Sequence, residues 1–415
     1  MRNKKHLLIF IFIIMISMVQ AGGFRVSLQG VRQAAMAHTS AHVRDASVAF
    51  FNPGGIAFIP SKLSISSGGF LVGTKVNYQN LQTHYKASTN NPISTPMTFN
   101  VAYKATNQIS VALSITTPFG STVNWGGDWA GKDLINKIEL QAFYIQPTVA
   151  YRFNNWISVG AGFIYATGNV NLQKSLTPVN GQMKLEDKNA SGNGFNVGVY
   201  LRPTDKLDIS VAYRSKVDMK AKKGKAEFDI PSSLVGESPF LTSTDQFSAT
   251  LPLASEFTLG LTYRVLPKLS ISADWNVSGW NRYENLTFNF KKNQVGNLEN
   301  DPTVSMAPKK FKNSNTFRIG GEYLATEYLA VRLGYYYDQS PVRSNFWSPE
   351  TPSTNNNAVT GGVGYSFYNK KLMVDLSGIY YVGNSRKFNN EFYNFSGEAN
   401  LSSFIVGLGL TWNPF

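Results

Sequence analysis

The stretch "KLDISVAYRSKVDMK", Lys206–Lys220, alternates apolar and polar side chains with a period of two residues. Successive side chains of a β-strand point to opposite faces of its sheet, so this alternation predicts a strand with one apolar face and one wet face. The apolar face carries Leu207, Ile209, Val211, Tyr213, Val217 and Met219, and the wet face carries Asp208, Ser210, Arg214, Lys216 and Asp218.

The same alternation recurs from Leu63 to the end of the chain, as in "KLSISADWNVSGW" (residues 268–280) and "LAVRLGYYYD" (residues 329–338). It predicts an all-β fold of fourteen strands. The predicted strands begin near Leu63, Met97, Ile109, Ile138, Trp156, Gly194, Leu207, Phe257, Leu269, Phe317, Tyr328, Val359, Leu372 and Leu401.

The predicted connections alternate between long and short. Long connections cover residues 80–95, 119–137, 173–190, 221–246, 291–312, 341–356 and 384–397, and between them the strands are joined by turns of two or three residues. An even number of antiparallel strands, with long loops at one end and tight turns at the other, is typical of a bacterial outer-membrane β-barrel. The sequence therefore predicts a transmembrane barrel over residues 61–415.

Aromatic residues mark the short-turn end of most even-numbered strands, on the apolar face. Such a ring is expected where a barrel crosses the membrane interface. A soluble β-sandwich is the alternative, but it does not require connections that alternate so regularly in length. Tyr200 on the sixth strand departs from the ring because it falls on the polar face, and the terminal Phe415 departs from the parity of the last strand. The ring comprises Tyr103, Tyr151, Tyr263, Tyr323, Tyr365 and Trp412.

The N-terminus has the features of a cleaved signal peptide, predicted to cover residues 1–21. Arg2, Lys4 and Lys5 precede an apolar run, Leu7–Val19, that is short for a membrane-spanning helix, and Ala21 ends the segment. The chain has no cysteine, which rules out disulfides and a lipid anchor on cysteine. We therefore expect export to the bacterial outer membrane.

The net charge of the chain is +14, of which +11 remains without the three basic residues among 1–21. The basic residues are scattered rather than gathered in a stripe, so nucleic acid is not an expected partner. Outer-membrane lipid and anionic lipopolysaccharide are the expected partners of such a surface.

Residues 22–60 precede the first strand and contain the irregular stretch "DASVAFFNPGGIAFIP", Asp45–Pro60. Pro53 removes a backbone donor, and the glycines that follow favour turns, so neither a long helix nor a central strand fits. A fourteen-stranded barrel is too wide for its own side chains to fill. Irregular backbone is tolerated at membrane depth where it is enclosed by protein. We therefore predict that residues 22–60 form a hatch inside the lumen.

With these features, the sequence resembles the FadL/TodX family of outer-membrane transporters for long-chain fatty acids and other hydrophobic compounds. "DASVAFFNPGGI" is similar to the family's A-x-x-x-x-N-P-A run, with Gly54 in place of its last alanine. "TPFG…DWAGK" (residues 117–132) resembles the loop after the third strand, and "KNSNTFRIGGEYLATEYLAVRLGYYYDQSPV" (residues 312–342) resembles the family most. "QPTVAYRFNNWISVGAGFIY", "GFNVGVYLRPTDKLDISVAYRSKV" and "TLPLASEFTLGLTYRV" follow later strands in order.

The resemblance implies passive, hatch-gated uptake of a long-chain fatty acid or an aromatic hydrocarbon, without catalysis and without a cofactor. External loops would capture the ligand, an internal pocket would hold it, and movement of the hatch would release it. A kink in a nearby strand would open a lateral gap, so both lateral and periplasmic exits stay open. The barrel assembly machinery is the expected partner during biogenesis.

Candidate ligand-binding and gating residues come from three places. In the hatch they are Phe50, Phe51, Asn52, Pro53, Gly54 and Ile56, although the two phenylalanines would serve equally well as anchors of the plug. In the fourth long loop they are Leu234, Val235, Phe240 and Leu241, which would form a capture groove unless the loop packs on itself. For a ligand carboxylate, Lys312 and Arg318 match a basic motif of the family, and Arg214, Lys216 and Arg332 are also predicted to face the lumen.

One departure from the family argues against an anionic ligand, because an arginine expected inside the fifth strand is missing near Thr167. Two alternatives stay open beside fatty acid or hydrocarbon uptake: haem (hemin) uptake, from the spacing of His38 and His42 if that stretch is helical, and a general diffusion porin. No predicted strand contains a histidine, so an outer-membrane hydrolase is not expected, and no metal site is predicted.

Overall fold

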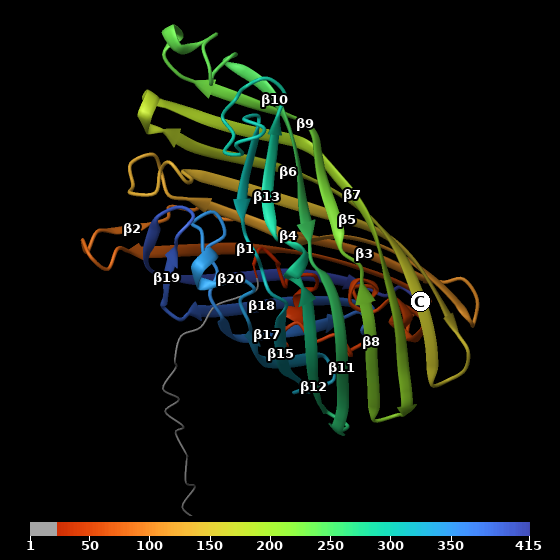
Figure 1. Cartoon of the computed structure of the whole chain (residues 1–415). Coiled ribbons are helices and arrows are strands. Elements are labelled where there is room, and N and C mark those ends of the chain that lie inside the picture. Colours follow the sequence, from red (N-terminus) through yellow and green to blue (C-terminus); the bar gives the residue numbers. More distant parts are fainter. Residues whose placement is uncertain (1–22) are drawn as a thin grey trace, which may run out of the picture.

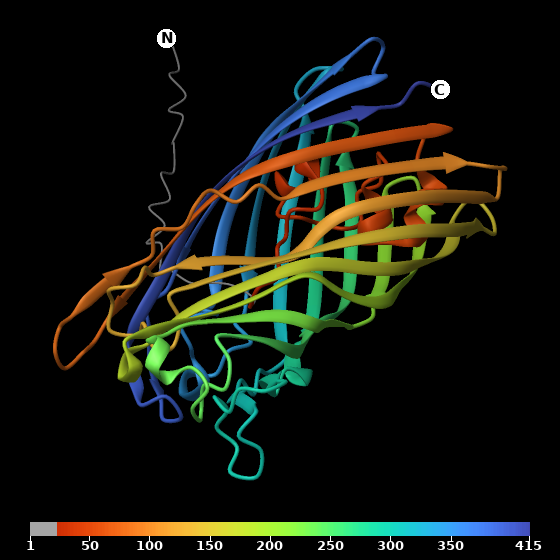
Figure 2. The ribbon, with the colours of Figure 1, turned by 90° about the horizontal axis from the view of Figure 1, so that it is seen from above.

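The computed structural model describes residues 23–415, so the predicted signal peptide lies outside the described residues. The strands form one closed antiparallel barrel (Figures 1 and 2). The ring closes where β1 (Leu63–Gln79) pairs with β20 (Phe395–Trp412), from Ile65 opposite Trp412 to Gln79 opposite Glu398. The wall has fourteen strands, which confirms the predicted fold class.

Ten wall strands are continuous and four are built from two segments each. Besides β1 and β20, the continuous strands are β3 (Met97–Lys104), β4 (Ile109–Asn124), β5 (Lys137–Arg152), β6 (Ile157–Leu176), β7 (Gly181–Thr204), β16 (Leu329–Asp338), β17 (Asn356–Phe367) and β18 (Leu372–Gly383). The composite strands are β8 (Leu207–Arg214) with β9 (Val217–Asp229), β10 (Thr244–Leu253) with β11 (Ser255–Leu266), β12 (Leu269–Gly279) with β13 (Asn285–Phe290), and β14 (Val304–Pro308) with β15 (Ser314–Leu324).

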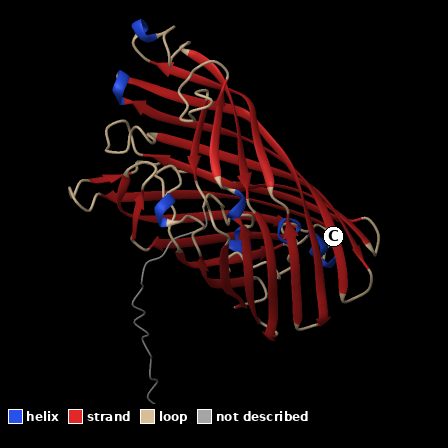
Figure 3. Ribbon diagram, in the orientation of Figure 1, coloured by secondary structure: helices blue, strands red, loops and turns tan. Residues whose placement is uncertain are grey.

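The other elements are short and lie in the N-terminal segment or in the loops (Figure 3). The described part of the chain has no helix that is long and apolar enough to cross a membrane. These elements are α1 (Val31–Ala34), α2 (Val48–Phe51), η1 (Pro53–Phe58), η2 (Thr177–Val179), η3 (Ser232–Leu234), η4 (Trp280–Arg282), η5 (Ser344–Phe346), β2 (Lys86–Ser88) and β19 (Arg386–Asn390).

Several strands start where the alternation predicts, at Leu63, Met97, Ile109, Leu207, Leu269 and Leu372. The predicted loop over residues 173–190 is wrong, because β6 and β7 continue through it and leave only residues 177–180 as the connection. These strands extend well past the apolar belt, where the outer face is polar and apolar residues such as Met183 and Leu185 are buried on the inner face.

The aromatic ring at the short-turn end is confirmed. All six of its side chains are exposed on the outside of the barrel: Tyr103, Tyr151, Tyr263, Tyr323, Tyr365 and Trp412. Tyr200 points inward instead, as its parity predicts, and its hydroxyl donates to the carbonyl of Ala41 at 3.0 Å.

Along the seventh wall strand, the apolar side chains change from the outer face of the wall to the inner face. On β8, Tyr213 faces outward, but on β9, Val217 and Met219 are buried inside and Lys220 is exposed, as is Lys216 just before β9. The parity changes at the break between β8 and β9. The prediction that Val217 and Met219 share a face with Leu207, and that Lys216 faces the lumen, is therefore wrong. Beyond the lipid, the outer face meets water and the inner face packs a core.

That inner core closes the long-loop end of the lumen with an aromatic cap, defined here as Tyr78, Trp125, Trp129, Trp347, Phe388 and Phe395. Its rings stack in pairs, with centroids 4.4 Å apart for Trp125 and Trp129 and 3.9 Å apart for Trp347 and Phe388. The fully buried Lys309 pairs with Glu350 and donates to the Ser348 hydroxyl at 3.1 Å, which fixes the loop that carries Trp347.

Residues 23–62, the N-terminal segment, run inside the ring of strands (Figure 2). Most of their side chains are buried, and they form two clusters with inward-facing wall residues. Buried ion pairs also hold the segment in place, because Arg32 donates to both carboxylate oxygens of Glu322 on β15 at 2.8 Å. The segment therefore occupies the lumen that the width of the barrel would otherwise leave open.

Candidate ligand-binding site

Strand β4 has a bulge at Thr117 and Pro118. Thr116 pairs with Tyr144 of β5, but the next pair joins Phe119 to Ala142, so β4 contains one extra residue there. Pro118 has no N–H to donate to a ladder, which explains why the irregularity falls at this position. The bulge reverses the parity of β4, so Phe119 is buried on the lumen side.

The edge of β4 beyond the bulge is covered by the N-terminal segment. The pairing of β3 with β4 ends near Thr98 and Thr116. Beyond that point the amide of Val26 donates to the carbonyl of Pro118 at 2.8 Å, and the amide of Gly120 donates to the carbonyl of Phe24 at 3.0 Å. The segment thus completes the wall where β3 stops.

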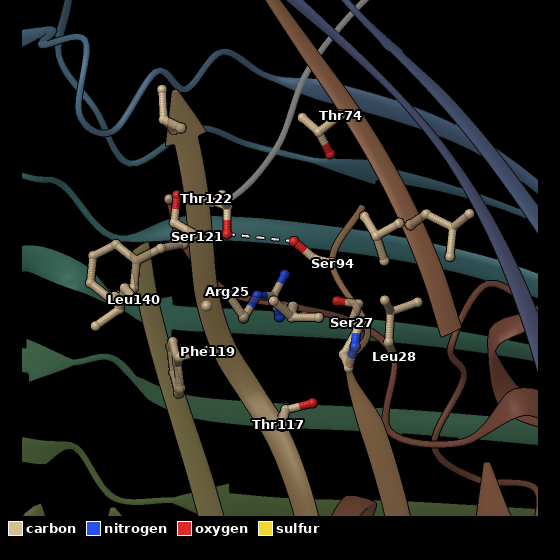
Figure 4. A pocket seen from close by; sticks show the side chains of 18 of the residues that line it. Arg25, Ser27, Leu28, Thr74, Ser94, Thr117, Phe119, Ser121, Thr122 and Leu140 are labelled. Carbon is tan, nitrogen blue, oxygen red and sulfur yellow. Dashed lines mark hydrogen bonds between the residues drawn. The ribbon is translucent and has the colours of Figure 1, made fainter. Parts of the chain in front are cut away.

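A cavity of about 210 Å³ lies beside this junction (Figure 4). It is bounded by the start of the N-terminal segment, the long-loop halves of β1, β4 and β5, and the loop before β3. Aliphatic and aromatic side chains alternate with hydroxyl groups around it. The apolar lining includes Leu28, Val72, Val76, Phe119, Leu140, Phe143, Leu401 and Ile405, and the hydroxyl lining includes Ser27, Thr74, Ser94, Thr117, Ser121 and Thr122.

Strand β5 contributes neighbouring residues to the cavity. On β5, Leu140 and Ala142 are buried toward the lumen, and Gln141 and Phe143 have the opposite parity. Yet Leu140, Gln141 and Phe143 all line the cavity. The cavity is therefore lined by residues of both parities of β5, next to the bulge in β4.

The charged residues that line this cavity neutralise each other. Arg25 donates to Glu256 at 2.8 Å and to Asp338 at 3.0 Å, and the same two terminal nitrogens also donate to Asn276 and Thr316, whereas its Nε has no partner among the described residues. Asp338 and Arg25 are the charged side chains in the lining. The cavity therefore offers a ligand apolar contacts and hydroxyl groups, with its cation already paired.

The Asn52-Pro53-Gly54 stretch lies against β6 and β7. The Asn52 amide nitrogen donates to Ser210 Oγ at 2.8 Å and to the carbonyl of Val199 at 2.9 Å, and its oxygen accepts the amide of Gly54 at 2.9 Å. Ser158 Oγ donates to the carbonyl of Gly54 at 2.7 Å. The kink is thus fixed to the wall by its side chain and its backbone.

The neighbouring hatch candidates are packed as anchors. Phe50 and Phe51 are buried and meet edge to face with centroids 5.5 Å apart. The Arg214 guanidinium lies 3.8 Å from the centre of the Phe50 ring, and Ile56 is buried in the cluster of η1 with the wall. Both phenylalanines also border a small polar cavity of about 30 Å³, which includes the bulge residue Pro118 and shares Arg25, Val26 and Ser27 with the larger cavity.

The predicted cations do not share one site. Arg318 is buried and donates to Ser27 Oγ at 3.2 Å, but Lys312 is exposed beyond the end of β15. Arg332 pairs with Glu322 and Asp375, and Arg214 pairs with Glu256. Arg332 and Arg214 thus have carboxylate partners that the sequence alone does not reveal, whereas Arg318 has no carboxylate within ion-pair distance among the described residues.

The residues predicted to form the capture groove differ in exposure. Phe240 is buried against Phe228 of β9, with ring centroids 5.9 Å apart, and Val235 and Leu241 are exposed, with Leu234 partly covered. The capture groove stays a prediction.

The two hatch histidines do not lie on one helix, so the condition for the haem alternative fails. Helix α1 ends at Ala34, and His38 has a positive φ of 62°. His38 accepts the amide of Gln29 at 3.2 Å, and His42 lies 2.9 Å from Arg32 and 3.2 Å from Ser270. Burial, reinforced by neighbouring arginines, lowers the pKa of both imidazoles well below the usual value.

A closed fourteen-stranded barrel with an apolar outer belt, a filled lumen and a cavity beside a bulge in its wall is an outer-membrane transport barrel. Residues 12–413 match the family model "Outer membrane protein transport protein (OMPP1/FadL/TodX)", and the chain belongs to this family.

Curated relatives are similar over most of their length. The long-chain fatty acid transport protein of Salmonella typhi is 25% identical over 324 residues, which is 71% of each chain. Outer membrane protein P1 of Haemophilus influenzae is 22% identical over 412 residues, 88% of this chain and 86% of the relative.

Two solved structures share the fold. A Pseudomonas aeruginosa FadL homologue has a TM-score of 0.82 at 19% identity, covering 94% of this chain and all of that chain. The Pseudomonas putida toluene transporter TodX has a TM-score of 0.71 at 16% identity, covering 96% and 99%.

Proposed function

We propose that this protein mediates passive uptake of neutral hydrophobic molecules of about the size of a monoaromatic hydrocarbon. The cavity at the β4 bulge would bind the ligand, and the N-terminal segment would act as the hatch. The single observation that supports this cargo most is the pairing of Arg25 with Glu256 and Asp338, which leaves a lining of apolar groups and hydroxyls.

The size of the cavity supports the same cargo. An engineered apolar cavity of about 150 Å³ binds benzene, and this cavity measures about 210 Å³. A long acyl chain would need more room and would place a carboxylate beside a cation that is already neutralised. Burial of apolar groups supplies the binding free energy, at about 0.8 kcal/mol for each CH₂.

Lateral exit is the favoured route, because the cavity lies beside the bulged stretch of β4, where the N-terminal segment rather than β3 covers the strand edge. Residues 24–26 would separate from the β4 edge and let the ligand pass into the membrane without crossing water. No step in this scheme involves a bond to the ligand, so we propose transport without catalysis, cofactor or metal.

Uptake of radiolabelled toluene and of radiolabelled oleate should be compared in cells that lack their own transporter of this family. We expect faster toluene uptake with the protein than without it, persisting when the proton-motive force is abolished and metabolism of the cargo is blocked. Faster oleate uptake with unchanged toluene uptake would favour long-chain fatty acids, the cargo in the names of the curated relatives. Complete dependence on the proton-motive force would contradict a passive mechanism.

A deletion of Asn52–Gly54 tests the hatch itself. The deletion should alter toluene uptake while the barrel keeps its heat-modifiable gel mobility, which reports the folded state. Normal uptake by a correctly folded deletion variant would show that this stretch only fills space.

A further inference from the structure

The outer wall of the barrel has a second irregularity, far from the cavity at the β4 bulge. Strand β10 pairs with β13 from Phe247 to Ala249, and the next pairing between these two wall strands joins Ser255 of β11 to Gly279 of β12. Between them, η4 and the residues around it interrupt the ladder. The interruption leaves a recess of about 550 Å³ over β9, β10 and β13.

The recess opens to the outside of the barrel. On β13, Leu286 and Phe288 pack against the inner core, so Asn285 and Thr287, which line the recess, have the outward parity. On β9, Met219 and Ala221 are buried inside, and Lys220 and Lys222 point the other way and are exposed.

The rim of the recess is basic and its cations are unpaired. Lys220, Lys222 and Arg282 line it, and in the described part of the chain none of the three is within ion-pair distance of a carboxylate. Asp218 is the acidic residue of the lining, and Lys216 neutralises it at 2.6 Å. The remaining lining side chains include hydroxyl and amide groups, which suit sugar hydroxyls.

The height of the recess above the membrane limits which molecules can reach it. An outer row of exposed aromatic residues, including Tyr213, Phe257 and Trp275, marks the long-loop edge of the apolar belt, with Phe257 paired to Tyr213. Thr250 lies seven residues before Phe257 on the same wall strand. At about 3.4 Å per residue and a tilt of about 40°, it stands roughly 18 Å beyond the aromatic row. That height is in the carbohydrate layer of the outer leaflet.

We propose that this recess binds the phosphorylated sugars of outer-leaflet lipopolysaccharide, with Lys220, Lys222 and Arg282 on the phosphate groups. An arginine and two lysines on a concave surface match the charge and the oxygen acceptors of phosphate. The hydroxyl and amide side chains between them contact the sugar ring. The site is independent of the transported cargo and would hold the barrel in a fixed relation to its lipid neighbours.

The test is binding of rough lipopolysaccharide, with a phosphorylated inner core, to the purified full-length barrel in detergent with EDTA present. The variant combines Lys220→Gln, Lys222→Gln and Arg282→Gln. A matched control combines Lys75→Gln, Lys86→Gln and Lys387→Gln, three exposed lysines on β1, β2 and β19 with the same change in charge. Each basic residue near an anionic lipid surface contributes about five-fold in affinity, so we expect roughly a hundred-fold loss for the recess variant and little loss for the control.

Two further arms separate the possible ligands. Chemically dephosphorylated lipopolysaccharide should bind the unaltered protein as weakly as intact lipopolysaccharide binds the recess variant, and inorganic phosphate should compete poorly. Equal losses in the recess variant and the control would show a general effect of net charge and overturn the site. Strong competition by inorganic phosphate would assign a free-phosphate site instead. Heat-modifiable mobility of every variant must match that of the unaltered barrel, and a recess variant that keeps full binding while folded would refute the proposal.

Discussion

Gly160 of β6 lies directly against Pro53 of the N-terminal segment, so closely that a Cβ at position 160 would overlap the Pro53 carbonyl and stand 2.6 Å from the Gly54 nitrogen. Gly198, the residue paired with Gly160 on β7, meets Asn52 in the same way. Two glycines on neighbouring strands thus form the surface on which the kink rests.

Gly160→Val should therefore push the kink off the wall. Overpacking of a close contact costs about 1–3 kcal/mol, enough to populate a displaced hatch. We expect a several-fold rise in permeation of a small polar probe with normal heat-modifiable mobility. Gly378→Val is the control, because a Cβ at Gly378 would meet open space. Unchanged permeation in Gly160→Val would mean that the kink does not close the lumen.

Arg25→Met should release the start of the N-terminal segment from β4. The change leaves Glu256 without one partner and Asp338 without its ion-pair partner, and removing one member of a buried ion pair costs about 3–5 kcal/mol. The chain has no cysteine, so a single Val26→Cys probe reports the motion through its rate of maleimide labelling. We expect labelling to be at least about ten-fold faster with Arg25→Met. Lys75→Met, on the outer face of β1, is the control and should leave the labelling rate unchanged. Equal labelling rates for the two variants would contradict the proposal that Arg25 holds the start of the N-terminal segment against β4.

Ser121→Phe should block the ligand cavity. Ser121 lines the cavity on β4 between the inward residues Phe119 and Val123, and a phenyl group there would occupy much of the available volume. Toluene uptake should fall several-fold, while Ser121→Ala, which removes only the hydroxyl, should transport normally. If the phenylalanine variant folds and transports as well as the alanine variant, the ligand takes another path.

Lys309→Met should loosen the aromatic cap. The change removes the partner of Glu350, so the loop that carries Trp347 loses one of its attachments and keeps those to Asn390 and Trp125. Trypsin should cut faster after Arg343, which is exposed in that loop. Adding Glu350→Leu should restore resistance, because replacing both partners of a buried pair by apolar groups is often neutral. If the double variant is as sensitive as the single one, the salt bridge is not what orders the loop.

The sequence predicted the strands well inside the lipid, where each residue faces either hydrocarbon or the polar lumen. From Leu269 to Val277, apolar and polar residues alternate because successive side chains face the hydrocarbon and the lumen in turn. Beyond the lipid the pattern is reversed, because the outer face meets water and the inner face packs a core. The sequence places Val217 and Met219 on the wrong face because no local feature marks the break between β8 and β9. The long β6–β7 hairpin was missed for the same reason.

The candidate site was harder to predict than the fold. The Asn52-Pro53-Gly54 kink stands out in the sequence through its composition. The cavity, by contrast, is assembled from Leu28, Thr74 and Phe143, which come from three separate elements and carry no motif. Arg25 was not a candidate, since its importance depends on two carboxylates more than 200 residues away in the chain. Pro118 is the local sequence feature at the bulge, but it suits equally well the long connection that the sequence predicts from residue 119.

The pairing of β20 with β1, extended by the Lys62 amide that donates to the Phe415 carbonyl at 3.1 Å, has a consequence for biogenesis. The N-terminal segment is continuous with the first strand, and its ion pairs reach strands as late as β15. These ion pairs can form only after β15 has taken its place in the wall, so we expect the N-terminal segment to reach its final packing late in folding, when most of the barrel is paired.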